Sequence, residues 1–416
     1  MNSNIETLTT ADGTPLKKKL EQSLFKNKLR AFGLVSPLLI FLVFLFILPI
    51  FLLLFQGVYD SRFTNLMPET TKSLENWDGL SEPTEKMNAA LVIDLISARK
   101  NKTIGKVATR VNRELSGARS LFTSSARKAA KLEAPYKEAL VKLNKKWGNI
   151  ETWQAMKVSS NLFTIGYIAS SLDFKLNADG SLSLKDEDRR IHVKLFLRTL
   201  EISLIVTLAT LLLGYPIAYL MASLPLRTSN LLLILVLLPF WTSLLVRTTA
   251  WIAMLQGEGV MNDLFVIFGF AEDDERFSLI YNKTGVLIAM THILLPFMVL
   301  PIYSVMKTIS PSYVRAAKSL GATNSKAFWR VYMPMTIPGI GAGGLLVFIL
   351  AIGYYITPAL VGGQDGQMIS NFIDFHMRKS LNWNLAAAMG LILLMIILFL
   401  FWVYDRVVGI DNMKLG

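Results

Sequence analysis

The stretch RAAKSLGATNSKAFWRVYMPMTIP, residues 315–338, is a polar segment that lies between two long hydrophobic runs. Its small and apolar side chains recur at helical spacing, at Ala316, Ala317, Leu320 and Ala327 or Phe328. Gly321 predicts a break between two short helices, and Pro334 and Pro338 predict the end of the second helix. An amphipathic loop of this kind, on the basic side of a membrane protein, is expected to present a surface to another protein.

The chain around this segment is too apolar for a soluble globule. Of its 416 residues, 52% are hydrophobic and 18% are charged, and the mean hydropathy is +0.44, which is typical of a multi-spanning membrane protein. The formal net charge of +13 comes from lysines and arginines at the N-terminus, in one long loop and in the segment above. Membrane topology and phospholipid contact explain this distribution better than nucleic acid does, so no nucleic-acid partner is expected.

About six apolar runs are long enough to cross a hydrocarbon core of about 30 Å. They lie at 31–55, 196–222, 231–255, 284–306, 337–360 and 385–404. Short basic connections alternate with acidic ones, which predicts that both termini and the segment 315–338 are cytoplasmic. The sequence thus divides into a basic cytoplasmic segment at 1–30, a first transmembrane helix at 31–56, an extracytoplasmic insert at 57–194, a five-helix core at 195–407 with a cytoplasmic loop at 307–336, and a cytoplasmic tail at 408–416.

The insert at 57–194 is charged and helix-prone, and it has no apolar run long enough to span a membrane. Segments Glu85–Arg99 and Thr103–Phe122 are expected to be helical, the second with apolar positions at Ile104, Val107, Val111 and Leu115. A small core is expected from aromatic residues: Trp77, Trp147, Trp153, Tyr136 and Tyr167. Two interpretations are open. The insert is a solvated helical cap, which we favour, or it docks a soluble partner or covers the translocation path.

Ionisable and aromatic side chains inside the spans are candidates for a substrate path, because charge is costly in a membrane. The ionisable candidates are Glu201 and Arg247, and the aromatic candidates, which can hold an organic cation on their ring faces, are Trp241, Tyr354 and Tyr355. Structural interpretations remain open for all of them. Arg247 can snorkel or pair, and aromatic residues also form interfacial belts. His292 is expected to be a core histidine.

The sequence contains no phosphate-binding motif G-x-x-x-x-G-K-[ST]. It also lacks the serine-nucleophile motif G-x-S-x-G and the zinc-protease motif H-E-x-x-H. It has no cysteine, and His192, His292 and His376 lie far apart in the sequence, so neither disulfides nor a metal site are expected. We therefore expect no catalytic residue and no cofactor in this chain. If ATP drives transport, a partner subunit binds it.

The segment 315–338 resembles the cytoplasmic coupling loop of ABC importer permeases, whose pattern is Glu-Ala-Ala, then Gly-Ala, Phe and Pro. The residues that match in register are Ala316, Ala317, Gly321, Ala322, Phe328 and Pro334. Arg315 stands where the family has glutamate, which leaves open any salt bridge of that glutamate. Four further stretches resemble the spermidine/putrescine branch of the type I importer permeases, at 213–225, 235–256, 294–309 and 353–363.

This resemblance implies an all-α membrane protein of about six transmembrane helices, with the type I ABC importer permease fold and an enlarged, helical extracytoplasmic insert. It implies a bacterial inner-membrane location, and as partners two ATP-binding subunits, a second permease subunit, a periplasmic substrate-binding protein and membrane lipid. The residues expected to couple to the ATPase are Arg315, Ala316, Ala317, Leu320, Gly321, Ala322, Phe328 and Pro334.

The function expected from the resemblance is uptake of polyamine-like cations. The candidates for their path are Glu201, Trp241, Arg247, Tyr354 and Tyr355. Alternatives from other classes are a permease for another small solute (an amino acid or an opine-like molecule), an ion-coupled carrier, and a membrane scaffold or sensor in which the insert is the working part.

Overall fold

The computed structural model describes residues 16–408, and the chain divides into two compact units at Gln56 and Gly57. The first unit is one helical rod, which consists of α1 (Leu16–Leu42), the π-helical turn η1 (Val43–Ile47) and α2 (Leu48–Phe55). Its apolar part, Ser23–Phe55, is long enough to cross a membrane. Pro49 does not end the rod, because it stands in the first turn of α2, directly after the π-helical turn.

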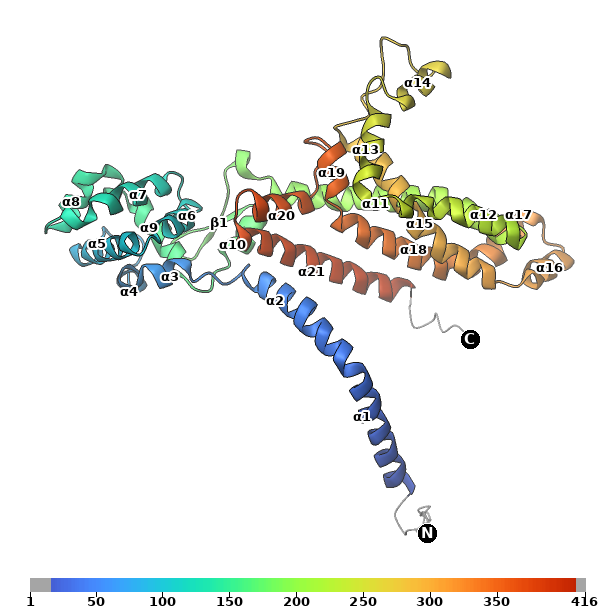
Figure 1. Cartoon of the computed structure of the whole chain (residues 1–416), viewed down its shortest axis with the longest axis horizontal. Helices are drawn as coiled ribbons and strands as arrows, with labels where there is room; N and C mark the ends of the chain where they lie inside the picture. The colour runs from blue at the N-terminus through green and yellow to red at the C-terminus, as the bar shows by residue number, and fades with distance from the viewer. Residues whose placement is uncertain (1–15, 409–416) are drawn as a thin grey trace. The chain divides into compact units, whose positions relative to one another are not determined.

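The second unit begins with a domain at 57–191 that we call the helical domain (Figure 1). Its elements are α3 (Arg62–Leu66), α4 (Pro68–Glu75), α5 (Glu85–Lys100), α6 (Ile104–Asn112), α7 (Ala118–Lys128), η2 (Ala129–Lys131), α8 (Tyr136–Leu143), η3 (Lys145–Gly148), α9 (Ile150–Ser160), α10 (Gly166–Ser171), β1 (Phe174–Leu176), β2 (Leu182–Leu184) and η4 (Glu187–Arg189). The predicted helix Glu85–Arg99 corresponds to α5. The predicted helix Thr103–Phe122 is wrong as one element, because Gly117, with a φ of 85°, separates α6 from α7.

Aromatic residues form the core of the helical domain, as expected. Trp147 and Trp153 are fully buried with their rings 6.4 Å apart, Trp77 is also buried, and Tyr136 packs at the edge. The expectation that Tyr167 belongs to this core is wrong, because Tyr167 packs in a different cluster with Leu195 and with residues of the spanning helices. The strands β1 and β2, which pair antiparallel, were missed, although an Asp179–Gly180 turn between two short alternating runs is a hairpin signal.

The rest of the chain is the membrane core. Its elements are α11 (His192–Ser223), α12 (Leu226–Leu237), η5 (Leu238–Trp241), α13 (Leu244–Leu255), α14 (Val260–Ile267), α15 (Lys283–Thr308), α16 (Pro311–Ser319), α17 (Asn324–Ala327), η6 (Phe328–Tyr332), α18 (Met333–Gly353), α19 (Ile356–Val361), α20 (Ile369–Arg378) and α21 (Trp383–Val408). Helices α11, α15 and α18 pack closely together. A Cβ on Gly339 would lie 3.0 Å from the Cα of Ile302, and one on Gly343 would lie 3.0 Å from the carbonyl oxygen of Met298. The glycines of α18 therefore serve close helix packing.

The all-α membrane architecture is confirmed, with one change in the predicted spans. Five helices of residues 16–408 are long and apolar enough to cross a membrane, or up to six if the bent pair Leu226–Trp241 and Leu244–Ile267 forms one span. The expected continuous span at 231–255 is wrong, because this pair bends by 96°. The break follows Pro239, and the side chain of Ser243 caps the new helix by accepting a hydrogen bond from the amide of Val246.

Candidate functional site

A helix lies on each side of Gly321, as predicted: α16 before it and, after it, a run that begins with α17. Gly321 has a φ of 88°, and the amides of Gly321 and Ala322 donate to the carbonyls of Lys318 and Ala317 at 2.9 and 3.0 Å. These two bonds are the Schellman arrangement that ends a helix at a left-handed residue. Thr323 then caps α17 by accepting from the amide of Lys326. The local sequence alone therefore sets the turn.

Helix α16 presents most of its surface to solvent. Leu320 is 90% exposed and Tyr313 is 52% exposed, although both are large apolar residues. Of the predicted coupling residues, Arg315, Ala316, Leu320, Gly321 and Pro334 are exposed, and Ala317, Ala322 and Phe328 are half-buried. Leu320 and Tyr313 with the small residues Ala316 and Gly321 therefore give α16 a mainly exposed surface, part of it apolar. We call α16 with its turn, residues 311–322, the exposed hairpin.

Phe328 turns inward instead. Its ring makes edge contacts with Tyr219 at 5.5 Å and Tyr215 at 6.3 Å, both on α11, and it stacks on Tyr332 at 5.9 Å. This cluster packs η6, which follows the exposed hairpin, against α11 of the membrane core. The expectation that Pro334 and Pro338 end the second helix is wrong. Residues Asn324–Gly353 form one run, because the π-helical turn η6 precedes Pro334 at the start of α18.

The five candidates for a substrate path do not form one cluster. The carboxylate of Glu201 pairs with the ammonium of Lys283 at 2.5 Å, and both side chains are partly exposed. Trp241 is 76% exposed at the end of η5. Tyr355 lies under the guanidinium of Arg378 at 5.8 Å. Within residues 16–408, no hydrogen bond or ring contact joins Glu201, Trp241 or Tyr355 to the other two candidates.

Arg247 and Tyr354 do lie near each other, beside His292. Arg247 is within electrostatic range of both Tyr354 and His292. The indole of Trp251 donates to Nδ1 of His292 at 3.2 Å. His292 and Leu295 line two apolar cavities, of about 420 and 330 Å³. His292 borders both cavities and Trp251 borders one, so this polar group is the best-placed candidate for a path through the described residues.

Arg247 also stabilises the break in the bent pair, because its guanidinium donates to the carbonyl of Thr242 at 3.0 Å. A hydrogen bond from a charged donor contributes about 1.5–3 kcal/mol, so we expect Arg247→Ala to speed amide exchange in the first turn of α13 by about tenfold or more. Arg247→Lys keeps a donor and should retain most of the protection. Hydrogen exchange measured by mass spectrometry checks this, and an alanine variant that exchanges like wild type would favour a snorkelling arginine.

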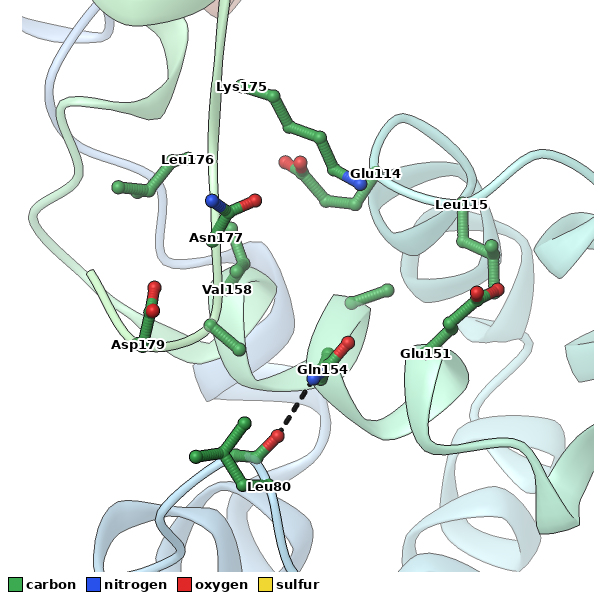
Figure 2. A pocket seen from close by; sticks show the side chains of 13 residues that line it. Leu80, Glu114, Leu115, Glu151, Gln154, Val158, Lys175, Leu176, Asn177 and Asp179 are labelled. Carbon is green, nitrogen blue, oxygen red and sulfur yellow. Dashed lines mark hydrogen bonds between the residues drawn. The ribbon is translucent and has the colours of Figure 1, made fainter. Parts of the chain in front are cut away.

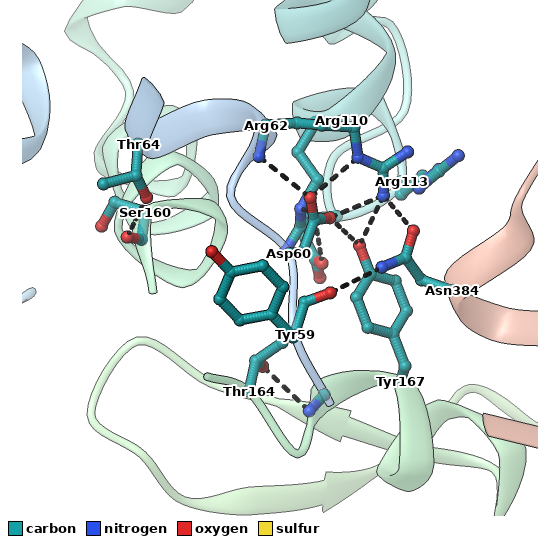
Figure 3. A network of polar contacts seen from close by, with 12 residues as sticks. Tyr59, Asp60, Arg62, Thr64, Arg110, Arg113, Ser160, Thr164, Tyr167 and Asn384 are labelled. Atoms are coloured by element: carbon teal, nitrogen blue, oxygen red, sulfur yellow. Dashed lines mark hydrogen bonds and ion pairs between the residues drawn. The ribbon is translucent and has the colours of Figure 1, made fainter. Parts of the chain in front are cut away.

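Sequence reasoning missed a buried polar cluster where the helical domain meets the membrane core (Figure 3). Asp60, 3% exposed, accepts from Nε of Arg62 at 2.8 Å and from the hydroxyl of Tyr167 at 2.5 Å. The guanidinium Nε of Arg110, on α6, lies 3.0 Å from the same carboxylate. Arg62 also donates to the amide oxygen of Asn384, in the first turn of α21. We call these five side chains the junction cluster.

The junction cluster keeps Asp60 charged. Burial raises its pKa, but hydrogen bonds from Arg62 and Tyr167 and the charge of Arg110 outweigh burial and lower the pKa to about 2. A second contact lies alongside: Arg113 donates to the carbonyl of Leu381 at 3.0 Å. The helical domain is therefore tied to the start of α21 by directional bonds.

A cleft of about 350 Å³ opens between α9 and the β1–β2 turn of the helical domain (Figure 2). Its walls carry the carboxylates of Glu114, Glu151 and Asp179 and the ammonium of Lys175. Glu114 is already paired with Arg110 at 2.7 Å. The cleft thus keeps two carboxylates, Glu151 and Asp179, and one ammonium, Lys175, outside the Arg110 ion pair.

Comparison with known proteins gives a matching family model and similar curated proteins. Residues 214–408 match the family model described as "Binding-protein-dependent transport system inner membrane component". The spermidine/putrescine transport system permease protein PotB of Escherichia coli (strain K12) is 34% identical over 224 residues, which are 54% of this chain and 81% of PotB. PotB of Haemophilus influenzae is also 34% identical over 224 residues, 54% of this chain and 78% of that protein.

Among solved structures, one chain of a bacterial alginate ABC transporter, crystallised with an alginate pentasaccharide-bound periplasmic protein, is similar with a TM-score of 0.44. It is 16% identical, and the similarity covers 54% of this chain and 80% of that chain. The matched family region, 214–408, includes the exposed hairpin and excludes the helical domain.

Proposed function

This chain belongs to the family of binding-protein-dependent transport system inner membrane components, and we propose that it is the permease subunit of an ATP-driven importer that takes up polyamines such as spermidine and putrescine. The proposed cargo follows the PotB relatives, which share about a third of their residues with this chain over four fifths of their length.

The observation that carries the proposal is the exposed hairpin. Leu320 stands almost fully in solvent at a turn that Gly321 fixes, while Phe328 anchors the same segment to α11. The sequence has no motif of its own for nucleotide hydrolysis. Energy must then enter through a partner, and a helix that lies in a groove of an ATP-binding subunit is a known mode of such recognition.

The proposed complex contains two ATP-binding subunits, this chain, a second permease subunit and a periplasmic substrate-binding protein. Both termini and the exposed hairpin face the cytoplasm, and the helical domain faces outward. ATP is bound by the partner subunits, and this chain needs no cofactor. Cargo passes beside Arg247, Tyr354 and His292, the last of which borders the two cavities. Since Arg247 is itself cationic, Trp251 and Tyr354 supply the aromatic faces for the cargo's ammonium groups.

Uptake into proteoliposomes that hold the complete complex tests the proposal. Radiolabelled spermidine should enter only with ATP on the side of the ATP-binding subunits and with the substrate-binding protein on the other side. Putrescine should compete, and amino acids or opines should not. Uptake by this chain without ATP, driven by an ion gradient, would show an ion-coupled carrier instead. If an amino acid competed and putrescine did not, the chain would still be an importer permease, but its cargo would be an amino acid.

A further inference from the structure

The outward face of α7 carries only basic and hydroxyl side chains. Residues 116–132 contain no acidic residue, and Arg119, Arg127, Lys128 and Lys131 are all exposed. The same helix buries Ala118, Leu121, Phe122, Ser125 and Ala126 against the domain core. Its orientation is thus fixed by packing, and the basic side chains project away from the domain.

Neighbouring elements add charge at both ends of α7. At its C-terminal end, the guanidinium of Arg99 donates to the carbonyl of Ala126 at 3.3 Å, which places Arg99 beside Arg127. At its N-terminal end, the ammonium of Lys146 lies 3.2 Å from where a Cβ on Gly117 would be. We call Arg99, Arg119, Arg127, Lys128, Lys131 and Lys146 the basic face. In the described part of the chain, none of the six is paired with a carboxylate.

The position and composition of the basic face argue against the surrounding membrane as its partner. Figure 1 shows α5, α7 and α8 at the end of the helical domain that is furthest from α11, α15 and α18. Helix α7 exposes no large hydrophobic side chain, and the neighbouring α5 exposes two, Ile93 and Ile96. A helix that lies on a lipid surface needs such side chains to insert between the headgroups. The basic face is therefore suited to a soluble partner.

We propose that the basic face docks an acidic surface of the soluble protein that delivers the cargo. This inference rests on the proposed function: free polyamines are cations, which six unpaired positive charges would repel, whereas a carrier protein with excess acidic side chains would be attracted. The helical domain lies outside the region that the family model matches, so the family itself supplies no role for it. The junction cluster then ties the docked carrier to the start of α21.

The test measures binding of the importer's own substrate-binding protein, loaded with spermidine, to the complete complex in phosphatidylcholine nanodiscs. In the triple variant Arg119→Glu, Arg127→Glu and Lys131→Glu, the association rate should fall by about tenfold, and its dependence on salt should flatten. The double variant Arg127→Gln and Lys131→Gln, which removes charge without reversing it, should lie between. The control is Lys72→Glu, Lys86→Glu and Arg189→Glu, which makes the same charge change on exposed residues outside the basic face and should leave the rate near wild type.

Equal association rates for wild type and the triple variant would overturn the inference, as would no binding to the wild-type complex. A second measurement records binding of the complex to vesicles of equal parts phosphatidylglycerol and phosphatidylcholine. If the triple variant lost binding to these vesicles but still bound the substrate-binding protein at the wild-type rate, the partner would be a lipid surface and the inference would be overturned. The proposed function is checked separately by spermidine uptake of the wild-type complex. If the wild-type complex takes up spermidine but the triple variant associates at the wild-type rate, only the docking surface is rejected. If the wild-type complex takes up no spermidine, the proposed function is rejected.

Discussion

Replacing Gly321 with valine is expected to reduce ATP-driven uptake by about tenfold or more while the protein still inserts into the membrane. Gly321 has a φ of 88°, and a Cβ there would meet no atom within 4 Å, so the effect comes from the backbone and not from a clash with neighbours. A β-branched residue in this conformation costs about 2 kcal/mol, and this cost shifts the population of the turn by about thirtyfold. Uptake and carrier-stimulated ATP hydrolysis, measured in the same proteoliposomes, should both fall.

The matched variant is Gly321→Asn, because asparagine tolerates the left-handed region at lower cost. It should keep most of the uptake. If valine and asparagine gave equal uptake, close to wild type, the turn at Gly321 would have no part in coupling. If the valine variant were missing from the membrane, Leu320→Ser, which leaves the backbone unstrained, would take its place as the test.

Replacing Arg110 with methionine is expected to loosen the junction cluster. Arg110 is 1% exposed and its partners are Asp60 and Glu114, so methionine leaves a buried carboxylate with one cation fewer. Breaking a buried ion pair in this way costs about 3–5 kcal/mol. Amides of α6 and α10 should then exchange about a hundredfold faster or more, as measured by hydrogen exchange on the purified chain.

Arg119→Met is the control for that measurement, because it makes the same change on an exposed side chain of the same domain. Exchange in Arg110→Met that matched Arg119→Met would contradict the junction cluster.

The protection of the junction cluster also has a predicted pH dependence. The pKa of Asp60 is lowered from 3.8 to about 2, so its contribution is present above about pH 4 and is lost as the pH falls toward 2. In Asp60→Asn this acid-dependent loss should disappear.

The sequence was sufficient where local rules decide the structure. Hydropathy identified the long helices, and Gly321 identified the end of α16, because a left-handed turn with two local hydrogen bonds needs no distant partner. The exposed part of the candidate site could be predicted for the same reason. Residues of α16 make few contacts with the core, so their exposure follows from helical spacing alone.

Features that depend on residues distant in sequence could not be predicted. Asp60 meets Arg110 and Tyr167, and Arg62 meets Asn384, only after α6, α10 and α21 have packed together. In the sequence, Arg110 is indistinguishable from the other basic residues of a charged helix. Likewise, the inward position of Phe328 requires Tyr215 and Tyr219 of α11. The break at Thr242 did have a signal in the sequence, because Pro239 and the pair Thr242–Ser243 favour the start of a new helix. The apolar run at 231–255 nevertheless predicted one continuous span.

The central claim, that a cytoplasmic ATP-binding partner grips the exposed hairpin, is tested most directly by labelling at its tip. The chain has no cysteine, so Leu320→Cys introduces a single thiol on a side chain that is 90% exposed in wild type. A membrane-impermeant maleimide should label this thiol in inverted vesicles and not in intact cells, and bound ATP-binding subunits should protect it. Labelling in intact cells, or labelling that the ATP-binding subunits leave unchanged, would contradict the account.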